Sequence, residues 1–204
     1  MDLRTVEQKA TDRLLLLWII KQASPLDKYK LQKLPFRTEF DMNTRNKRCF
    51  HYEFFQYNYG PFSIEVYDDH DALKELSLIS ESGITSEINK EGERILSEFD
   101  SVFKQNGLLL SEMKEMISGL NRMSGFELVE DTHQMTVTWN SKVCKLREIP
   151  KHSTILPQQE DVHLKIDSST LESLIVMLTP ELIRDFRRVR SEGSTSSPYV
   201  PLTA

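Results

Sequence analysis

Asp68-Asp69-His70-Asp71 is the densest cluster of titratable side chains in the sequence. Carboxylates next to an imidazole could bind a metal ion or act as general acids and bases. However, four consecutive residues of a helix point in different directions, and acidic residues in its first turns stabilise the helix dipole. We therefore interpret this cluster as one surface of an acidic helix, and we predict no metal site and no catalytic role for it.

Motifs of common enzymes are absent from the sequence. GxxxxGK[ST], GxGxxG and GxSxG do not occur, and the five histidines show neither HExxH nor zinc-ligand spacing with cysteine. Cys49 and Cys144 form no CxxC motif and are too few for a disulfide scaffold, which favours a reducing compartment. We predict a cytoplasmic protein that is not an enzyme and needs no cofactor.

The first element that could position functional side chains is an apolar helix. Leu14–Ile20 leaves no polar face for most of two turns, so a helix at about residues 5–22 should be buried in the core. These seven residues are far fewer than the roughly 18 to 20 that a bilayer crossing needs. Acidic residues before the run also argue against a secretory signal. We predict no membrane association.

Residues 1–106 are predicted to form a mainly helical, winged-helix-like domain. Ser24 could cap a second helix with Pro25 at its first position, and Pro35 should kink or end that helix early. Ser63 could cap the third helix. The elements expected after the first helix are helices at about 26–39, 64–77 and 90–104 and a β-hairpin, the candidate wing, across about 78–88.

Residues 107–190 are predicted to form a small α+β domain with a short antiparallel sheet, which makes the whole chain α+β. Asn140-Ser141 is a plausible tight turn between two of its strands. The chain would end in a disordered tail, residues 191–204, rich in Ser, Thr and Pro. The elements expected before that tail are a helix at 111–120, strands at 126–130, 135–139, 143–149 and 162–166, a loop at 150–157, and a basic final helix from Thr179.

Seven aromatic residues lie within Cys49–Ser63. Nucleic-acid bases stack on such rings when cations are interleaved with them, but this segment contains no Lys or Arg. We therefore expect most of these rings to pack in the core, with one or two exposed to a partner.

Charge is distributed unevenly along a chain whose net charge is only -5. Leu26–Phe50 holds seven basic residues and three acids, whereas Gly60–Asp100 holds eleven acids and three basic residues. In the usual winged-helix docking mode, the helix before the wing enters the DNA major groove. Here that helix is acidic and would repel phosphates, which favours a protein partner over DNA.

One ordered set of motifs resembles a known family. Lys30-Leu31-Gln32-Lys33-Leu34 is followed by Tyr59-Gly60-Pro61-Phe62-Ser63, then by Glu65-Val66-Tyr67 and Leu76–Ile79. Over about residues 12–100 this set is similar to the Panacea (SocA-like) antitoxin domain and its phage-associated relatives. The resemblance implies a non-enzymatic module that neutralises a toxin by direct contact or acts as an adaptor for protein turnover.

Two functional hypotheses follow, and both leave homo-oligomer formation open. The first is an antitoxin-like or adaptor module that binds a basic protein, such as a toxin or a defence-system component, through its acidic helix and wing. Its expected contact residues are Tyr59, Glu65, Tyr67, Asp68 and Asp69. The alternative is a winged-helix transcription regulator whose second helix and following loop contact DNA. Its expected contact residues are Lys28, Lys30, Lys33, Arg45, Lys47 and Arg48.

Overall fold

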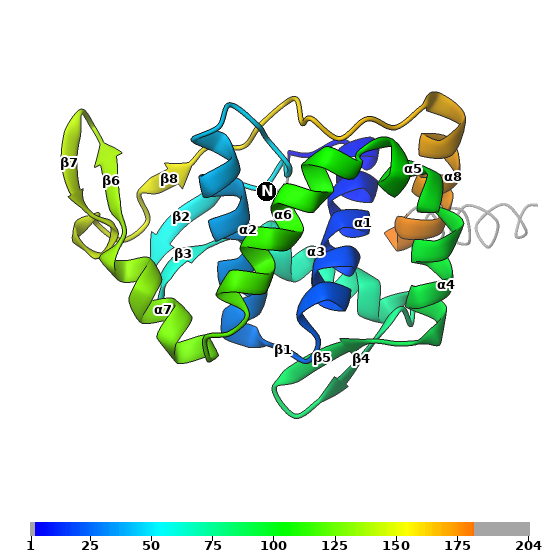
Figure 1. Ribbon diagram of the computed structural model, residues 1–204, viewed down its shortest axis with the longest axis horizontal. Coiled ribbons are helices and arrows are strands. Elements are labelled where there is room, and N and C mark those ends of the chain that lie inside the picture. The colour runs from blue at the N-terminus through cyan, green and yellow to red at the C-terminus, as the bar shows by residue number, and fades with distance from the viewer. Residues whose placement is uncertain (1–2, 182–204) are drawn as a thin grey trace, which may run out of the picture.

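A computed structural model describes residues 3–181 and shows an α+β fold (Figure 1). Within this part of the chain, eight α-helices surround or extend from a core, and three small antiparallel sheets lie at its edges. The predicted tail and the four arginines of the predicted final helix fall outside the described residues. The helices are α1 Val6–Ala23, α2 Lys28–Asn43, α3 Ile64–Glu75, α4 Lys90–Glu98, α5 Asp100–Gln105, α6 Gly107–Leu120, α7 Gly125–Gln134 and α8 Ser168–Leu178.

The apolar helix α1 is the centre of the core, as its composition predicts. Leu14–Leu17, Ile19 and Ile20 are fully buried, because α2, α3, α4, α6 and α8 all pack against this helix. Thr5 and Gln8 form a capping box at its N-terminus, which satisfies two backbone donors there. Figure 1 shows α1 enclosed between α6 in front and α3 behind.

The strands form two three-stranded sheets and one hairpin. The predicted hairpin is confirmed as β4 Ile79–Ser82 and β5 Thr85–Ile88, and a short strand before α2 extends it in the order β1-β5-β4. A second sheet has the order β3-β2-β8, and β6 pairs with β7 across the predicted turn. The remaining strands are β1 Leu26–Asp27, β2 Phe54–Tyr57, β3 Gly60–Phe62, β6 Thr136–Trp139, β7 Lys142–Lys145 and β8 Thr154–Leu156.

Helix α2 begins later and runs further than the sequence predicts. Its N-cap is Asp27, whose carboxylate accepts hydrogen bonds from the N–H groups of Tyr29 and Lys30, so Ser24 is not the cap. Pro35 lies inside the helix without ending it. The fourth predicted helix, in contrast, is divided at Phe99 into α4 and α5.

Three predictions for the second half of the chain are wrong. The strand predicted at 126–130 is part of α7, because Ser124 and Glu127 form a capping box that starts a helix there. Residues 162–166 form no strand, whereas β8 lies in the predicted loop and pairs with β2. The start of α7 is therefore fixed by a local cap, whereas β8 is fixed by its distant partner β2.

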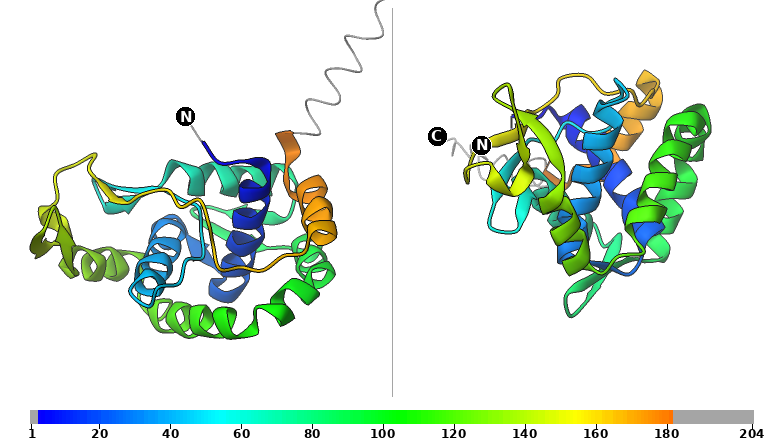
Figure 2. Two further views of the ribbon diagram at one scale, coloured as in Figure 1. Left: turned by 90° about the horizontal axis from the view of Figure 1, so that it is seen from above. Right: turned by 60° about the vertical axis from the view of Figure 1, so that its left-hand side comes forward.

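The predicted division at residue 106 does not separate two cores. Helix α8 packs against α1, α7 packs against α2, and β8 completes the sheet begun by β2 and β3. One continuous cluster of buried apolar side chains includes residues from α1 to α8. Figure 2 shows the long connection after β8 crossing the molecule to reach α8 beside α1. Residues on both sides of position 106 therefore stabilise one another.

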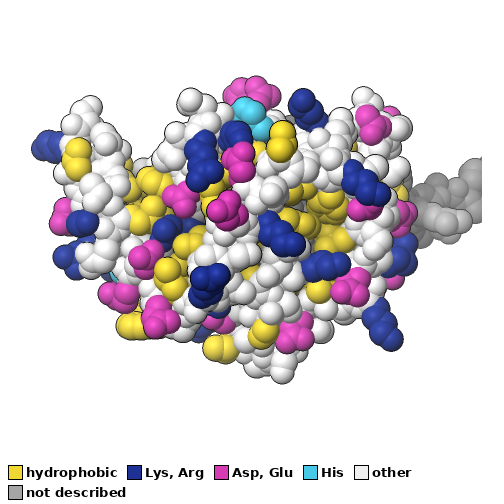
Figure 3. Space-filling view, viewed as in Figure 1, with side chains coloured by type: hydrophobic (Ala, Val, Ile, Leu, Met, Phe, Trp, Pro, Cys, Tyr) yellow, Lys and Arg dark blue, Asp and Glu magenta, His cyan; other side chains and the backbone are white. Residues whose placement is uncertain are grey.

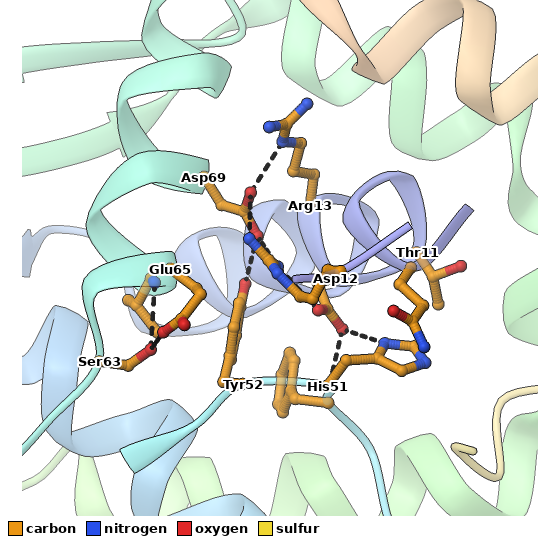
Figure 4. A network of polar contacts seen from close by, with 12 residues as sticks. Thr11, Asp12, Arg13, His51, Tyr52, Ser63, Glu65 and Asp69 are labelled. Atoms are coloured by element: carbon orange, nitrogen blue, oxygen red, sulfur yellow. Dashed lines mark hydrogen bonds and ion pairs between the residues drawn. The ribbon is translucent and has the colours of Figure 1, made fainter. Parts of the chain in front are cut away.

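A buried network of charged side chains joins these elements (Figure 4). The carboxylate of Asp69, on α3, accepts hydrogen bonds from Arg4 at 2.7 Å, Arg13 at 2.8 Å and the Tyr52 hydroxyl at 3.0 Å. Asp69 is fully buried. The prediction that Asp69 contacts a partner is therefore corrected, because its carboxylate faces inward and is occupied by arginines.

Two further carboxylates complete the network. Arg4 also donates to Asp12 at 2.8 Å, and the Asp12 carboxylate lies 2.9 Å from Nδ1 of His51. Arg13 donates to both carboxylate oxygens of Glu181 and to the carbonyl oxygen of Leu178 at the end of α8. The network thus ties the first described residues to the last.

We expect Asp69→Asn to lower the free energy of unfolding by roughly 3 kcal/mol, because it removes one carboxylate that two buried arginines share. Asp68→Asn is the matched control, since Asp68 is the exposed neighbour, and it should change stability by less than about 0.5 kcal/mol. Urea unfolding measures both. Equal stability of the two variants would show that the network contributes little.

Candidate functional site

Gln32 and Lys33 of α2 hold the turn that precedes α3. The Gln32 side-chain amide donates to the Ser63 carbonyl oxygen at 3.0 Å and accepts from the Ser63 N–H at 2.9 Å. Lys33 Nζ donates to the carbonyl oxygen of Pro61 at 2.8 Å. The donor and acceptor of each of these three hydrogen bonds are buried. The bonds therefore replace hydrogen bonds that the backbone of Pro61 and Ser63 would make with water in the unfolded chain.

Gly60 allows the turn between β2 and β3 to form. Its φ is +84°, a conformation that favours glycine, and a Cβ atom there would lie 3.1 Å from the ring of His133 on α7. Ser63 directly follows β3 and caps α3 by accepting a hydrogen bond from the Val66 N–H. The segment from Gly60 to Ser63 therefore fixes where α3 begins.

A pocket of about 260 Å³ lies between α2, the β2–β3 hairpin and α3. Its walls are mostly aromatic rings, with two lysines and a glutamine among them. We call it the tyrosine pocket, and it is lined by Lys28, Tyr29, Gln32, Lys33, Tyr57, Tyr59, Gly60, Phe62 and Tyr67. Tyr29 meets Tyr59 edge to face at 5.7 Å, and Phe62 lies 5.4 Å from Tyr67.

Lys33 has an uncommon environment for an ammonium group. It is 3% exposed, and burial lowers the pKa of its side chain from 10.5 to about 7. His133 faces it from α7, and burial also lowers the pKa of that imidazole. Lys33 can therefore gain or lose its proton near neutral pH.

The structure brings together two of the predicted protein-binding residues in this pocket. Tyr59 is 60% exposed and Tyr67 is half-buried. Glu65, at the start of α3, accepts a hydrogen bond from the Ser63 hydroxyl at 2.6 Å, and Asp68 is exposed one turn further along the helix. Asp69 alone of the five lies in the interior.

Exposed carboxylates lie on α3 and on β4, which Lys74 of α3 joins through its ion pair with Glu81. We call this surface the acidic face, and it consists of Asp68, Asp71, Glu75 and Glu81. Further exposed carboxylates lie on β5 and α4, namely Glu87, Glu91, Glu93 and Glu98. Arg94 pairs with Glu91 and Glu98. Asp68, Glu87 and Glu93 form no ion pair within residues 3–181.

Most of the predicted DNA-binding residues are engaged by the chain itself. Lys30 Nζ donates to the backbone and side-chain oxygens of Asn121, and Lys33 is buried beneath the turn. Arg45 and Lys47 both pair with Glu112 of α6. Figure 3 shows basic and acidic side chains interspersed over the side that α2 and α6 share, rather than one continuous basic patch.

Lys28 and Arg48 complete the set of predicted basic residues. Lys28 is exposed, and its Nζ lies 5.3 Å from the centre of the Tyr29 ring. Arg48 is half-buried, and its backbone N–H donates to His163. Of the six predicted basic residues, Lys28 and Arg45 are exposed and Lys33 is buried.

The predicted site residues did not include five residues that line the pocket: Tyr29, Gln32, Tyr57, Gly60 and Phe62. A signal for three of them was present, because Gln32 lies in the first motif of the family resemblance and Gly60 and Phe62 lie in the second. The first motif could not reveal that the Gln32 amide binds Ser63, which lies 31 residues away. In the structure, side chains of the first motif hold the backbone of the second.

Among residues 3–181, no three His, Cys, Asp or Glu side chains are grouped as the ligands of a metal ion would be. Among the helices of residues 3–181, none has the length and apolar character to span a membrane.

No family model, curated protein or solved structure matches the chain.

Because the folded state binds Lys33's proton less tightly than the unfolded state does, stability should rise with pH above about 7. We expect the free energy of unfolding to increase by roughly 1.5 kcal/mol between about pH 7 and 8.5. Urea unfolding at the two pH values measures this change.

Lys33→Met should abolish the increase and leave only the smaller, opposite contribution of Glu39, a carboxyl whose pKa burial raises to about 7. Lys142→Met is the control, because Lys142 is exposed on β7. An unchanged pH dependence in Lys33→Met would assign the effect to another group.

Proposed function

We propose that this protein is a non-enzymatic interaction module, antitoxin-like or an adaptor, that binds a basic protein partner through the acidic face. The observation that carries the proposal is the contrast between its two sets of charges. Carboxylates on α3, the β4–β5 hairpin and α4 are exposed, whereas Lys30, Lys33 and Lys47 are engaged by Asn121, Pro61 and Glu112.

The acidic face suits a basic protein for electrostatic reasons. Complementary charges accelerate encounter and suppress wrong partners more than they add affinity. Asp68 and Asp71 lie one helical turn apart, and the Asp71 side chain is 77% exposed. Lysine or arginine side chains of a partner could reach both carboxylates, because Asp68 forms no ion pair with the residues that the structure describes.

The resemblance to the Panacea antitoxin domain supports the same proposal. The motifs that carry it meet at the tyrosine pocket, where Tyr59 and Tyr67 lie beside the first turns of α3. Exposed tyrosines next to charged groups are typical of contact surfaces. The proposed contact residues are therefore Tyr59, Glu65, Tyr67 and Asp68, and the partner is a toxin or another component of a defence system.

We expect Asp68→Lys combined with Asp71→Lys to weaken partner binding at least tenfold, about 1.4 kcal/mol, because two attractive contacts become repulsive. The immobilised protein would first capture partners from its native cells, and the affinity would then be measured with the purified partner. Binding should also weaken as salt is raised.

Glu115→Lys is the matched control, because it changes an exposed carboxylate on α6 outside the acidic face. It should retain the partner with unchanged affinity. A partner that binds wild type and the double variant equally would contradict a role for the acidic face.

DNA binding by a winged-helix domain is the alternative, and the strand order β1-β5-β4 supports it. A strand between the first two helices that joins the hairpin after the third helix is the arrangement expected of that fold. However, α3 would be the recognition helix, and its exposed side chains are acidic. We therefore place this function second.

We expect no retardation of a 30-base-pair duplex in a gel at about 50 mM salt, a condition that strengthens phosphate contacts. The measurement would be repeated with Lys28→Ala combined with Arg45→Ala, the exposed basic residues of the predicted set. Retardation by wild type that decreases with salt and is lost in this variant would favour the alternative.

A further inference from the structure

The tyrosine pocket contains a cation without an anion. Among its lining residues are Lys28 and Lys33, and none is an aspartate or glutamate. Within residues 3–181, neither lysine forms an ion pair. The proposed contact with a basic partner does not explain this feature, because a second cation would be repelled from such a pocket.

Lys33 is the more informative of the two lysines. Its ammonium group has three N–H donors, and the Pro61 carbonyl oxygen accepts one of them at 2.8 Å. Buried charges in proteins are ordinarily paired with an opposite charge. An anion that enters the pocket would supply both the missing acceptors and the missing charge.

The size and walls of the pocket restrict what else the anion could carry. About 260 Å³ is slightly below the range typical of pockets for drug-sized ligands, so it suits a single ring. Tyr29, Tyr57, Phe62 and Tyr67 present ring faces and edges to this space. Flat rings pack favourably against such walls.

We propose that the tyrosine pocket binds a ligand that combines one flat ring with a carboxylate or phosphate group, with the anionic group beside Lys33. The ring would lie among Tyr29, Phe62 and Tyr67. Lys28, exposed at the rim over Tyr29, provides a second cation that can swing toward the anion. Tyr59 and Tyr67 belong both to this pocket and to the proposed contact residues, but the pocket contains none of the carboxylates of the acidic face and can bind an anion without the partner.

Binding should be linked to proton uptake. The pKa of Lys33 in the free protein is about 7, so above this pH the ammonium must first be formed before it can bind an anion. The titratable groups facing Lys33 are the tyrosines of the pocket and, from α7, His133 with its neighbour Glu130. Burial lowers the pKa of His133 from 6.5, so this group is neutral across the same range.

Three single-ring probes test the proposal: benzoate, phenyl phosphate and the neutral benzamide. Binding to the full chain is followed by NMR through the Lys33 side-chain and tyrosine ring signals. We expect benzoate or phenyl phosphate to bind at least about tenfold more tightly than benzamide at pH 6.5. The anion's affinity should fall by about tenfold per pH unit above 7, while that of benzamide should not change.

Lys33→Met should reduce the preference for the anion to less than about twofold. Lys142→Met is the control and should bind as wild type does. The pH comparison on wild type needs no variant, so it decides the question even if Lys33→Met fails to fold. Equal binding of benzamide, a pH-independent affinity of the anion, or no saturable binding of any probe would overturn the proposal. Preference for benzoate over phenyl phosphate, or the reverse, identifies the anionic group.

Discussion

The structure depends on the placement of one buried carboxylate. Asp69 accepts hydrogen bonds from Arg4, Arg13 and Tyr52, which come from the N-terminal segment, α1 and the segment before β2. On α3 the inward-facing side includes Asp69, His70 and Leu73, whereas Asp68 and Asp71 project from the opposite side of the helix. Asp68 and Asp71 are therefore exposed, and the position of Asp69 decides which carboxylates form the acidic face.

A second constraint connects α2 to α3. Gln32 binds the backbone of Ser63 through two hydrogen bonds, and the Ser63 hydroxyl accepts the N–H of Val66. Lys33 holds the preceding carbonyl oxygen of Pro61. The same contacts that start α3 also bring Tyr67 against Phe62, so the tyrosine pocket is a consequence of how the turn is held.

Local signals in the sequence were enough to predict several elements, among them α1, the Ser63 cap of α3 and the β4–β5 hairpin. They could not distinguish Asp68 from Asp69, because the difference is set by Arg4, which lies 65 residues from Asp69. Lys33 was likewise expected at the surface. Its burial could not be predicted locally, because Lys33 binds the carbonyl oxygen of Pro61, 28 residues later in the chain. The pairing of β8 with β2 joins Phe54 to Leu156, which is a longer separation in sequence than either of these. Most of what sequence reasoning missed is decided by long-range contacts, whereas the Asp27 cap of α2 and the Ser124–Glu127 capping box of α7 are local signals that it overlooked.

The tyrosine pocket and the acidic face have opposite charge, yet they share α3. Ser63 joins them, because its backbone is held by α2 at the pocket while its hydroxyl caps the helix that carries Asp68. Below about pH 7, where Lys33 is already protonated, an anion bound beside it would add negative charge next to the first turn of α3 and so strengthen the attraction for a basic partner. Linkage is reciprocal, so a basic partner on α3 would strengthen anion binding by the same factor. Cations on α2 and carboxylates on α3 are therefore compatible with a single binding function.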